Sequence, residues 1–265
     1  MKKNIYRVLL LLMVLIMATA CGLLQEPAAP SATIEAVPLE IEEPAVVEEP
    51  TETAAEPPVE PDESEETIEE EAAVEETAAE SDEVAAGGLQ IYEISQDESE
   101  VRFELDEDLR GVRTTVVGST DQVAGQIALD FSDLSTAQVG EIQINARTLA
   151  TDNNFRNRAI QNEILDTGEH EFISFVPTAV NGLPASAAMG EEISFTIDGD
   201  LTIRGITEPV TFNVVATAVS NSQITGTATA IVLRETYGLN IPEVPNVANV
   251  ESEVDLIITF VANAS

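Results

Sequence analysis

The amino-acid sequence predicts an all-β fold for residues 88–265, in which an antiparallel sheet closes into a barrel and carries one short helix. Apolar and polar residues alternate in about ten segments, which gives each segment one dry face. Turn residues such as Gly111, Gly140 and Gly205 separate many of these segments, as expected between antiparallel strands. Some segments are long, and a large twisted sheet of long strands tends to close on itself.

The stretch GDLTIRGITEPVTFNVVATAV, residues 199–219, shows this pattern most clearly. Leu201 and Ile203 share one face, and alternate residues from Val210 to Ala216 share a face after the turn at Gly205. This pattern predicts a β-hairpin with one apolar face. The other predicted strands cover residues 91–94, 101–105, 113–117, 127–131, 142–144, 173–180, 193–203, 224–232 and 254–260.

One segment, TDNNFRNRAIQNEIL at residues 151–165, follows a helical period instead. Phe155, Ala159 or Ile160, and Ile164 fall on one helical face, and Asp152 is a suitable N-cap. We expect a helix of about three turns that lies across one end of the barrel.

The chain begins with the features of a secretory signal. Basic residues precede a short apolar run, and small residues then lead to Cys21. This arrangement resembles the lipobox of bacterial lipoproteins, which implies a signal peptide over residues 1–20 and lipidation of Cys21. An uncleaved transmembrane anchor over residues 8–24 is the alternative. Both interpretations predict an extracytoplasmic protein, held on the cell membrane or the outer membrane.

Residues 21–87 have the composition of a disordered linker. From residue 25 onward, this stretch is rich in Glu, Pro and Ala and holds 22 acidic residues but no Lys or Arg. We expect a solvated tether that spans on the order of 45 Å, with an acidic binding motif as the alternative. Because Cys21 is the only cysteine, no intrachain disulfide is possible, and the core alone must hold the domain together.

The charge of residues 88–265 excludes several classes of partner. The segment holds the other 27 of the 49 acidic residues, against eight arginines and no lysine, since the other three basic residues precede residue 8. This negative charge argues against nucleic acid and phosphate-rich surfaces. It also favours a soluble monomer, although a dimer remains possible.

Two motifs resemble those of the YceI-like family of periplasmic polyisoprenoid-binding proteins. GDLTIRGITEPVTF is close to the family pattern G-D-L-T-I-x-G-x-T-x-P-V, and RETYG, with Arg234, Tyr237 and Gly238, is similar to R-x-x-[FY]-G. The resemblance extends from about Tyr92 to Phe260. It implies a lipocalin-like barrel with an isoprenoid chain along its apolar interior.

The chain also departs from the family. Members often carry a D-x-x-H-S element in the first hairpin, whereas this chain has ISQDESEVRF, with Ser99 and no histidine. The helical segment lacks the usual acidic-His pairing after Arg158. Residues 181–192, NGLPASAAMGEE, form a long insertion that we expect to be a mobile loop near the barrel mouth.

We expect a lipid to contact eight residues on the predicted inward faces. Medium-sized side chains on these faces leave room for a hydrocarbon chain, although a filled core would have the same periodicity. The resemblance favours the cavity. The predicted lining residues are Phe103, Phe131, Ile144, Phe175, Phe195, Phe212, Val214 and Ile258. Arg234 and Tyr237 are candidates for contact with a polar headgroup, because arginine binds phosphates well.

The sequence contains no convincing catalytic or metal-binding motif. His170 is the only histidine, residues 88–265 contain no thiol, and no G-x-S-x-G element is present. The acidic run at residues 106–108 fits a solvated turn better than a calcium site. We therefore expect no metal and no cofactor, apart from a bound isoprenoid lipid or quinone.

The predicted function is a surface-anchored lipoprotein, not an enzyme, that binds an amphiphilic lipid for transport, storage or sequestration. Two alternatives remain. One is a structural or adhesive surface domain with a filled core and a protein partner at its loops. The other is an enzyme acting on a lipid or quinone, which would need a polar pair facing inward.

Overall fold

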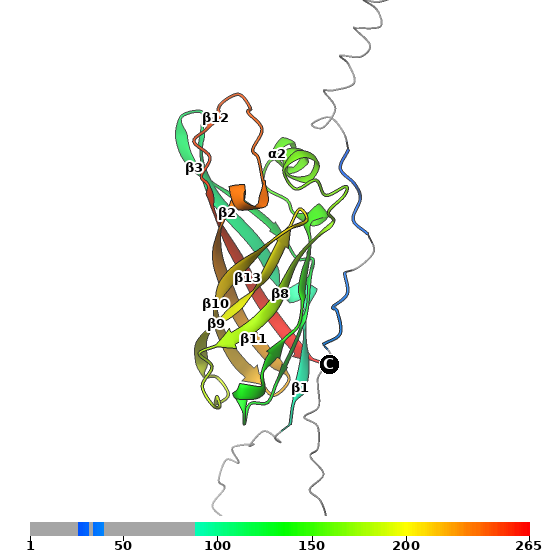
Figure 1. Ribbon diagram of the computed structural model, residues 1–265, viewed down its shortest axis with the longest axis vertical. Helices are drawn as coiled ribbons and strands as arrows, with labels where there is room; N and C mark the ends of the chain where they lie inside the picture. The colour runs from blue at the N-terminus through cyan, green and yellow to red at the C-terminus, as the bar shows by residue number, and fades with distance from the viewer. Residues whose placement is uncertain (1–25, 32–33, 40–87) are drawn as a thin grey trace, which may run out of the picture. The chain divides into compact units, whose positions relative to one another are not determined.

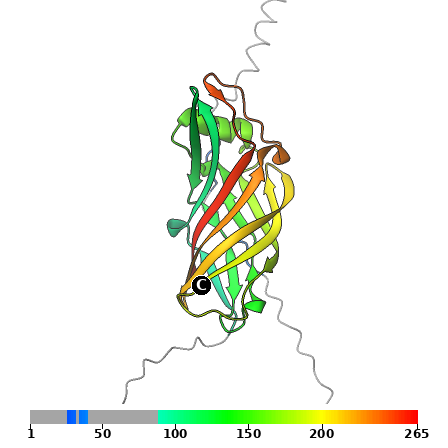
Figure 2. The same ribbon diagram turned by 90° about the vertical axis from the view of Figure 1, so that its left-hand side faces the viewer.

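Residues 88–265 form one antiparallel sheet of thirteen strands that curls into a barrel, as the sequence predicts (Figures 1 and 2). The computed structural model describes residues 26–31, 34–39 and 88–265. The long strands are β2 (Glu100–Leu109), β3 (Val112–Thr120), β8 (Phe172–Asn181), β9 (Glu192–Ile203), β10 (Ile206–Ser220), β11 (Gln223–Leu233) and β13 (Glu253–Ala264). The short ones are β1 (Gln90–Ile94), β4 (Val123–Ala124), β5 (Gln126–Leu129), β6 (Gln138–Val139), β7 (Ile142–Asn145) and β12 (Val247–Ala248).

The strand order explains how the sheet closes. The main path is β4-β7-β8-β9-β10-β11-β13-β1-β5-β6, and β2 and β3 branch from it. The final strand, β13, pairs with β1 near its C-terminal end and with β2 nearer its start, where Leu256 faces Phe103. β2 pairs with β3, and the chain runs from β3 directly into β4, where Val123 pairs with Ile144 of β7. The return to β7 thus runs through the chain between β3 and β4, whereas β3 itself pairs only with β2.

The β9–β10 hairpin contains the conspicuous stretch at residues 199–219. Phe212 pairs with Ile197 and Val214 pairs with Phe195, and the turn at Arg204 and Gly205 uses positive φ angles of 52° and 72°. Phe212, Val214 and Leu201 are buried. The hairpin therefore turns its apolar face to the barrel interior, as alternation requires.

The helix has about the expected three turns but begins at a different cap. It consists of α2 (Asn154–Ala159) followed by a π-helical turn, η4 (Ile160–Ile164). The side chain of Asn153, not Asp152, accepts hydrogen bonds from the first free amides, Phe155 N at 2.9 Å and Arg156 N at 3.3 Å.

The expected helical face is only partly correct. Ala159, Ile160 and Ile164 are buried, but Phe155 is 68% exposed. Phe155 lies in the first turn of α2, and the following residues form the wider turn of η4. Those later residues cover the barrel, whereas Phe155 projects from its rim.

The loop of residues 182–191 lies at the end of the barrel opposite α2, and not near the mouth as expected (Figure 1). Leu134 N donates to the carbonyl of Ala185 at 2.9 Å, and Leu183 and Ala187 pack against the core. These contacts cover the far end of the barrel.

Two stretches of the expected linker, residues 26–31 and 34–39, lie along the outside of the barrel, drawn in blue in Figure 1. We call them the N-terminal strap. The carbonyl of Ile34 accepts a hydrogen bond from Gln96 at 2.7 Å, and Leu39 N donates to Gln126 Oε1 at 2.8 Å. Ile34 is only 4% exposed. These twelve residues make specific contacts with the barrel that the prediction of a tether does not include, since Ile34 and Leu39 provide apolar and backbone contacts within the Pro- and Ala-rich sequence. Residues 40–87, the signal peptide and Cys21 lie outside the described residues.

The upper part of the strap is held by a carboxylate. Ser31 donates to the Glu171 carboxylate from its backbone amide at 2.6 Å and from its hydroxyl at 2.5 Å. Arg147 forms an ion pair with Glu171 at 2.8 Å, and Asn145 donates to it at 3.1 Å. Burial alone would raise the pKa of Glu171, but the bonds from Ser31, Arg147 and Asn145 together outweigh it and lower the pKa.

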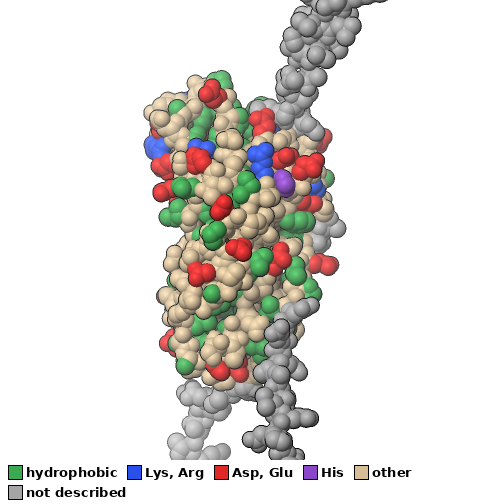
Figure 3. Space-filling view, in the orientation of Figure 1, with side chains coloured by type: hydrophobic (Ala, Val, Ile, Leu, Met, Phe, Trp, Pro, Cys, Tyr) green, Lys and Arg blue, Asp and Glu red, His purple; other side chains and the backbone are tan. Residues whose placement is uncertain are grey.

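Charged side chains are distributed unevenly on the barrel surface. Figure 3 shows acidic side chains scattered over the visible face, whereas the arginines on that face gather in its upper part, at the end that carries α2. On this face, the positive charge of an acidic domain is thus concentrated at one end.

We predict that the strap detaches at acid pH. The pKa of Glu171 is lower when Ser31 is bound than its ordinary value of 4.5, so docking is stabilised above that value and lost as the pH falls through the lowered pKa. Hydrogen exchange at the Ser31 and Leu39 amides should show protection at neutral pH that disappears on acidification. An identical pH profile in a Glu171→Gln variant would contradict this assignment.

We also predict that Gly199→Ala destabilises the barrel by about 1–3 kcal/mol, because the close packing leaves no room for a methyl group. A Cβ at Gly199 would lie 2.5 Å from the Phe175 ring and 2.6 Å from the Val176 carbonyl oxygen. Gly88→Ala is the matched control, since nothing lies within 4 Å of its Cβ position. Equal denaturation midpoints for the two variants would contradict this prediction, because both the Phe175 ring and the backbone at Val176 would then have to move without cost.

Candidate functional site

The barrel interior contains two apolar cavities, one above the other. The larger cavity, of about 430 Å³, lies at the end covered by α2, η4 and the loop of residues 239–250. The smaller, of about 110 Å³, lies towards the loop of residues 182–191. The larger volume lies within the range of about 300–1,000 Å³ that is common for small-molecule sites.

Two aromatic rings lie where the cavities meet. Phe175 of β8 and Phe212 of β10 pack edge to face, with ring centroids 4.9 Å apart and an interplanar angle of 69°. Both border the two cavities, as does Ile258 of β13. We call Phe175 and Phe212 the divider. Gly199 allows the Phe175 ring to pack closely against β9, because a side chain there would clash with it.

All eight predicted lining residues border one or both cavities. Phe103 and Ile144 border the larger one, and Phe131, Phe195 and Val214 border the smaller one. The remaining three, Phe175, Phe212 and Ile258, border both. Their positions in the barrel therefore follow the alternation of the sequence, and their contact with a lipid stays a prediction.

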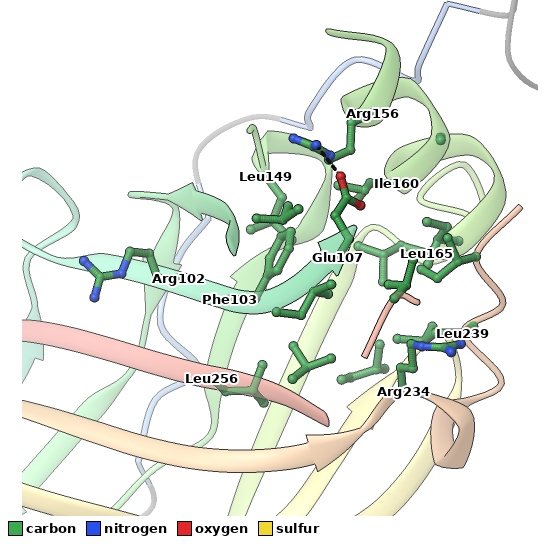
Figure 4. A pocket seen from close by; sticks show the side chains of 18 of the residues that line it. Arg102, Phe103, Glu107, Leu149, Arg156, Ile160, Leu165, Arg234, Leu239 and Leu256 are labelled. Carbon is green, nitrogen blue, oxygen red and sulfur yellow. Dashed lines mark hydrogen bonds and ion pairs between the residues drawn. The ribbon is translucent and has the colours of Figure 1, made fainter. Parts of the chain in front are cut away.

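A buried ion pair lies at the mouth of the larger cavity (Figure 4). Glu107 of β2 has a side chain only 7% exposed, and its carboxylate lies 2.9 Å from Nη2 of Arg156 on α2. Nη1 of Arg156 contacts Asp152 at 2.6 Å. Removing either partner of a buried pair leaves an unpaired charge, so this pair connects the helix to the barrel wall.

This ion pair was missed in the sequence. Glu107 belongs to the acidic run at residues 106–108, which the sequence assigns to a solvated turn. The signal was the alternation of Val101, Phe103 and Leu105, which continues inward to position 107. Arg102 borders the cavity too, but its guanidinium points away from it (Figure 4).

Arg234 borders the larger cavity but mainly braces its rim. Its Nε donates to the carbonyl of Glu251 at 3.0 Å and its Nη1 to that of Leu239 at 3.2 Å, while Nη2 pairs with Glu235 at 2.8 Å. These bonds hold both ends of the loop of residues 239–250. The predicted role in headgroup contact is therefore secondary to a structural one.

Tyr237 does not border either cavity among the lining residues described. Its side chain is fully buried, and its hydroxyl has no hydrogen-bond partner in the described part of the chain. Burial, together with the negative charge of Glu208, raises the pKa of Tyr237 to about 12. The residue is a neutral core side chain, and the structure does not bring it together with Arg234 at the mouth.

The loop of residues 239–250 contributes apolar lining that sequence analysis missed. Ile241, Pro242, Val244, Val247 and Val250 all border the larger cavity. These apolar residues follow RETYG closely in the sequence, and this clustering could have indicated a segment that lines the cavity. Because the loop has little regular structure, the alternation of apolar and polar residues could not show which of its side chains face the cavity.

The described residues show no group that suggests other chemistry. No cluster of three His, Cys, Asp or Glu side chains in residues 26–31, 34–39 and 88–265 is placed to hold a metal. No helix in those same ranges is long and apolar enough to cross a bilayer. His170 lies beside the β9–β10 turn, where a Cβ on Gly205 would be 3.0 Å from its ring.

Comparison with known proteins agrees with this geometry. The model of the YceI-like domain matches residues 92–262. The chain is 33% identical over 135 residues to UPF0312 protein SAS2572 of Staphylococcus aureus strain MSSA476, covering 47% of this chain and 70% of that protein. It has the same values against UPF0312 protein MW2606 of strain MW2.

Two solved structures share the fold. A polyisoprenoid binding domain from Saccharophagus degradans, implicated in plant cell wall breakdown, has a TM-score of 0.50 and 13% identity, covering 67% of this chain and all of that one. BcnA from Burkholderia cenocepacia has a TM-score of 0.50 and 19% identity, covering 64% of this chain and 99% of that one.

We predict that Tyr237→Phe raises the free energy of unfolding by about 1 kcal/mol, because it removes an unpaired buried hydroxyl. Tyr92→Phe is the matched control: Tyr92 is equally buried, but its hydroxyl donates to the carbonyl of Asn221 at 2.7 Å. That variant should lose about 1 kcal/mol. Chemical denaturation measures both, and a clear loss of stability in Tyr237→Phe would indicate a partner for its hydroxyl.

Proposed function

Because the chain belongs to the YceI-like family, we propose that it binds a long-chain amphiphilic lipid, most simply a polyisoprenoid, inside its barrel. The observation that carries this proposal is the apolar cavity of about 430 Å³ that opens beside α2 and continues, past the divider, towards a second cavity. The description of the Saccharophagus degradans domain as polyisoprenoid binding supports it.

The chemistry of the walls suits a hydrocarbon chain. The inward faces of nine strands contribute Ile, Val, Leu and Phe side chains, and polar groups border the larger cavity mainly near its mouth. Burial contributes roughly 0.8 kcal/mol per methylene, so an isoprene unit contributes about 4 kcal/mol relative to water. A few units are enough to offset the entropy lost on binding, which is about 4–15 kcal/mol.

The polar mouth orients the ligand. The headgroup would lie near Glu107, Arg156 and Arg110, while the chain extends towards the divider. Arg110 is exposed and forms no ion pair with any described residue. An arginine with free donors can bind a hydroxyl, carbonyl or phosphate oxygen.

We treat the protein as a carrier or store and not as an enzyme. Glu107 and Arg156 are an inward polar pair, but an arginine stays protonated and does not exchange its proton in general acid–base catalysis. A filled core would have favoured the alternative of a structural or adhesive domain. The open interior favours ligand binding instead.

We further propose that Cys21 is lipidated after removal of residues 1–20, so that the barrel works outside the cytoplasm as a membrane-anchored monomer. The basic, apolar and small residues before Cys21 support this. The membrane would then be both the attachment site and the source of the ligand.

The direct test is lipid extraction. The full chain, purified from membranes, should release a prenyl lipid or quinone in about equimolar amount when it is denatured and extracted, as measured by mass spectrometry. Leu256→Trp fills the larger cavity from β13 and should reduce the bound lipid about tenfold, equivalent to about 1.4 kcal/mol.

Ile231→Trp is the matched control, because Ile231 is exposed on the outer face of β11. It should leave the amount of bound lipid unchanged. A parent protein that carries no lipid and takes up no added polyprenol would overturn the proposal.

A further inference from the structure

We propose that the strap holds the mouth end of the barrel against the membrane, so that lipid passes between the bilayer and the cavity without crossing water. This inference rests on the proposed lipidation of Cys21 and on the proposed lipid binding. It is carried by where the strap begins, by the length of chain that precedes it and by the surface around the mouth.

The strap begins beside the helix that covers the cavity. The carbonyl of Ala29 accepts a hydrogen bond from Nη1 of Arg147 at 3.1 Å. The same guanidinium donates to the carbonyls of Thr167 at 2.8 Å and Gly168 at 3.2 Å, in the turn that directly follows η4. Arg147 therefore fixes the start of the strap at the mouth end.

The strap then runs towards the other end of the barrel. Ile34 contacts Gln96, which follows β1, and Leu39 contacts Gln126 at the start of β5 (Figure 1). The polarity of the strap is therefore fixed, with its N-terminal residues nearest the cavity mouth.

Few residues separate the strap from Cys21. From Cys21 to Glu26 there are five Cα–Cα steps, which span about 18 Å at most when fully extended. An acyl chain on Cys21 would therefore hold the mouth end within roughly 20 Å of the bilayer surface. With the strap released, the first contact of the anchored chain with the barrel would be at Gly88, 67 residues after Cys21, so the anchor would no longer hold the mouth end near the bilayer.

The surface at the mouth suits an interface with lipid. Phe155 on α2 and Val112 at the start of β3 are 68% and 65% exposed, the highest values among the large hydrophobic residues described. Arg110, in the same hairpin turn as Val112, is exposed and has no ion pair with any described residue. Apolar side chains next to a free arginine are typical of surfaces that contact headgroups and the acyl boundary.

Contact with the bilayer would remove an energetic barrier. A lipid that leaves the membrane through water loses roughly 0.8 kcal/mol for every methylene exposed, so a long prenyl chain would leave very slowly. A cavity mouth at the bilayer surface lets the chain move from one apolar environment to another. With the strap bound to the barrel, the link between Cys21 and the domain is short, and this short link sets the orientation of the barrel.

The test measures the orientation of the acylated full chain on phosphatidylcholine vesicles that contain a lipid-linked acceptor dye. Cys21 is the only cysteine and is blocked by acylation, so one introduced cysteine takes the donor dye. Glu243→Cys places the donor on the mouth loop, and Met189→Cys places it on the loop at the far end. We expect strong energy transfer from position 243 and weak transfer from position 189.

Strap variants show whether the strap causes this difference. Ile34→Ser removes the buried anchor and should make transfer from the two positions nearly equal, at the lower level. Val37→Ser is the matched control, because Val37 belongs to the strap but is 39% exposed, and it should keep the difference.

Three results would overturn the proposal: equal transfer from both positions in the parent chain, an unchanged difference in Ile34→Ser, or a mass that shows no acyl group on Cys21. Lipid extraction distinguishes these from failure of the proposed function. If the protein carries lipid but has no preferred orientation, the proposed lipid binding stands and the proposed orientation is wrong. If the mouth faces the bilayer but no lipid is bound, the proposed orientation stands and the proposed lipid binding is wrong.

Discussion

The interior of this protein follows from one constraint, which is that a large antiparallel sheet has an apolar face and no second layer to cover it. One short helix and two loops lie at the ends of the barrel, so the sheet buries its inner face by curling on itself. Backbone pairing fixes the radius of the curl, whereas side-chain volume decides how much of the interior is filled. With eight Phe, no Trp and many medium-sized side chains in the chain, space remains on both sides of the divider.

Most of the fold could be predicted because alternation is a local property of the chain. The β9–β10 hairpin and the long strands around it formed where the period of two and the turn residues placed them. The two-residue strands β4, β6 and β12 could not be predicted, since a pair of residues has no period. The strap was missed for a different reason: its contacts come from Ile34 and a few backbone groups, and composition alone averages these with the acidic stretch that follows.

The candidate site shows what alternation can and cannot specify. All eight predicted residues border a cavity, and seven of them lie in strands, where facing depends only on position; Phe131 lies just after β5. Alternation did not separate the two cavities, since the meeting of Phe175 and Phe212 depends on register and rotamer. Arg234 and Tyr237 were assigned from a motif, and the structure uses one to brace a loop and the other to fill the core. Glu107 was obscured by its acidic neighbours, although its inward facing could have been inferred.

The two ends of the sheet's main path also bear on how copies of this protein behave side by side. β4 and β6 are only two residues long, and Leu39 of the strap lies beside Gln126 of β5 and near Gly140, which follows β6. Free sheet edges can recruit strands from other molecules, and short edges with a neighbouring segment offer them little to pair with. The strap would therefore also protect the barrel against edge-to-edge aggregation, a risk that grows if, as proposed, many copies are held on one membrane surface.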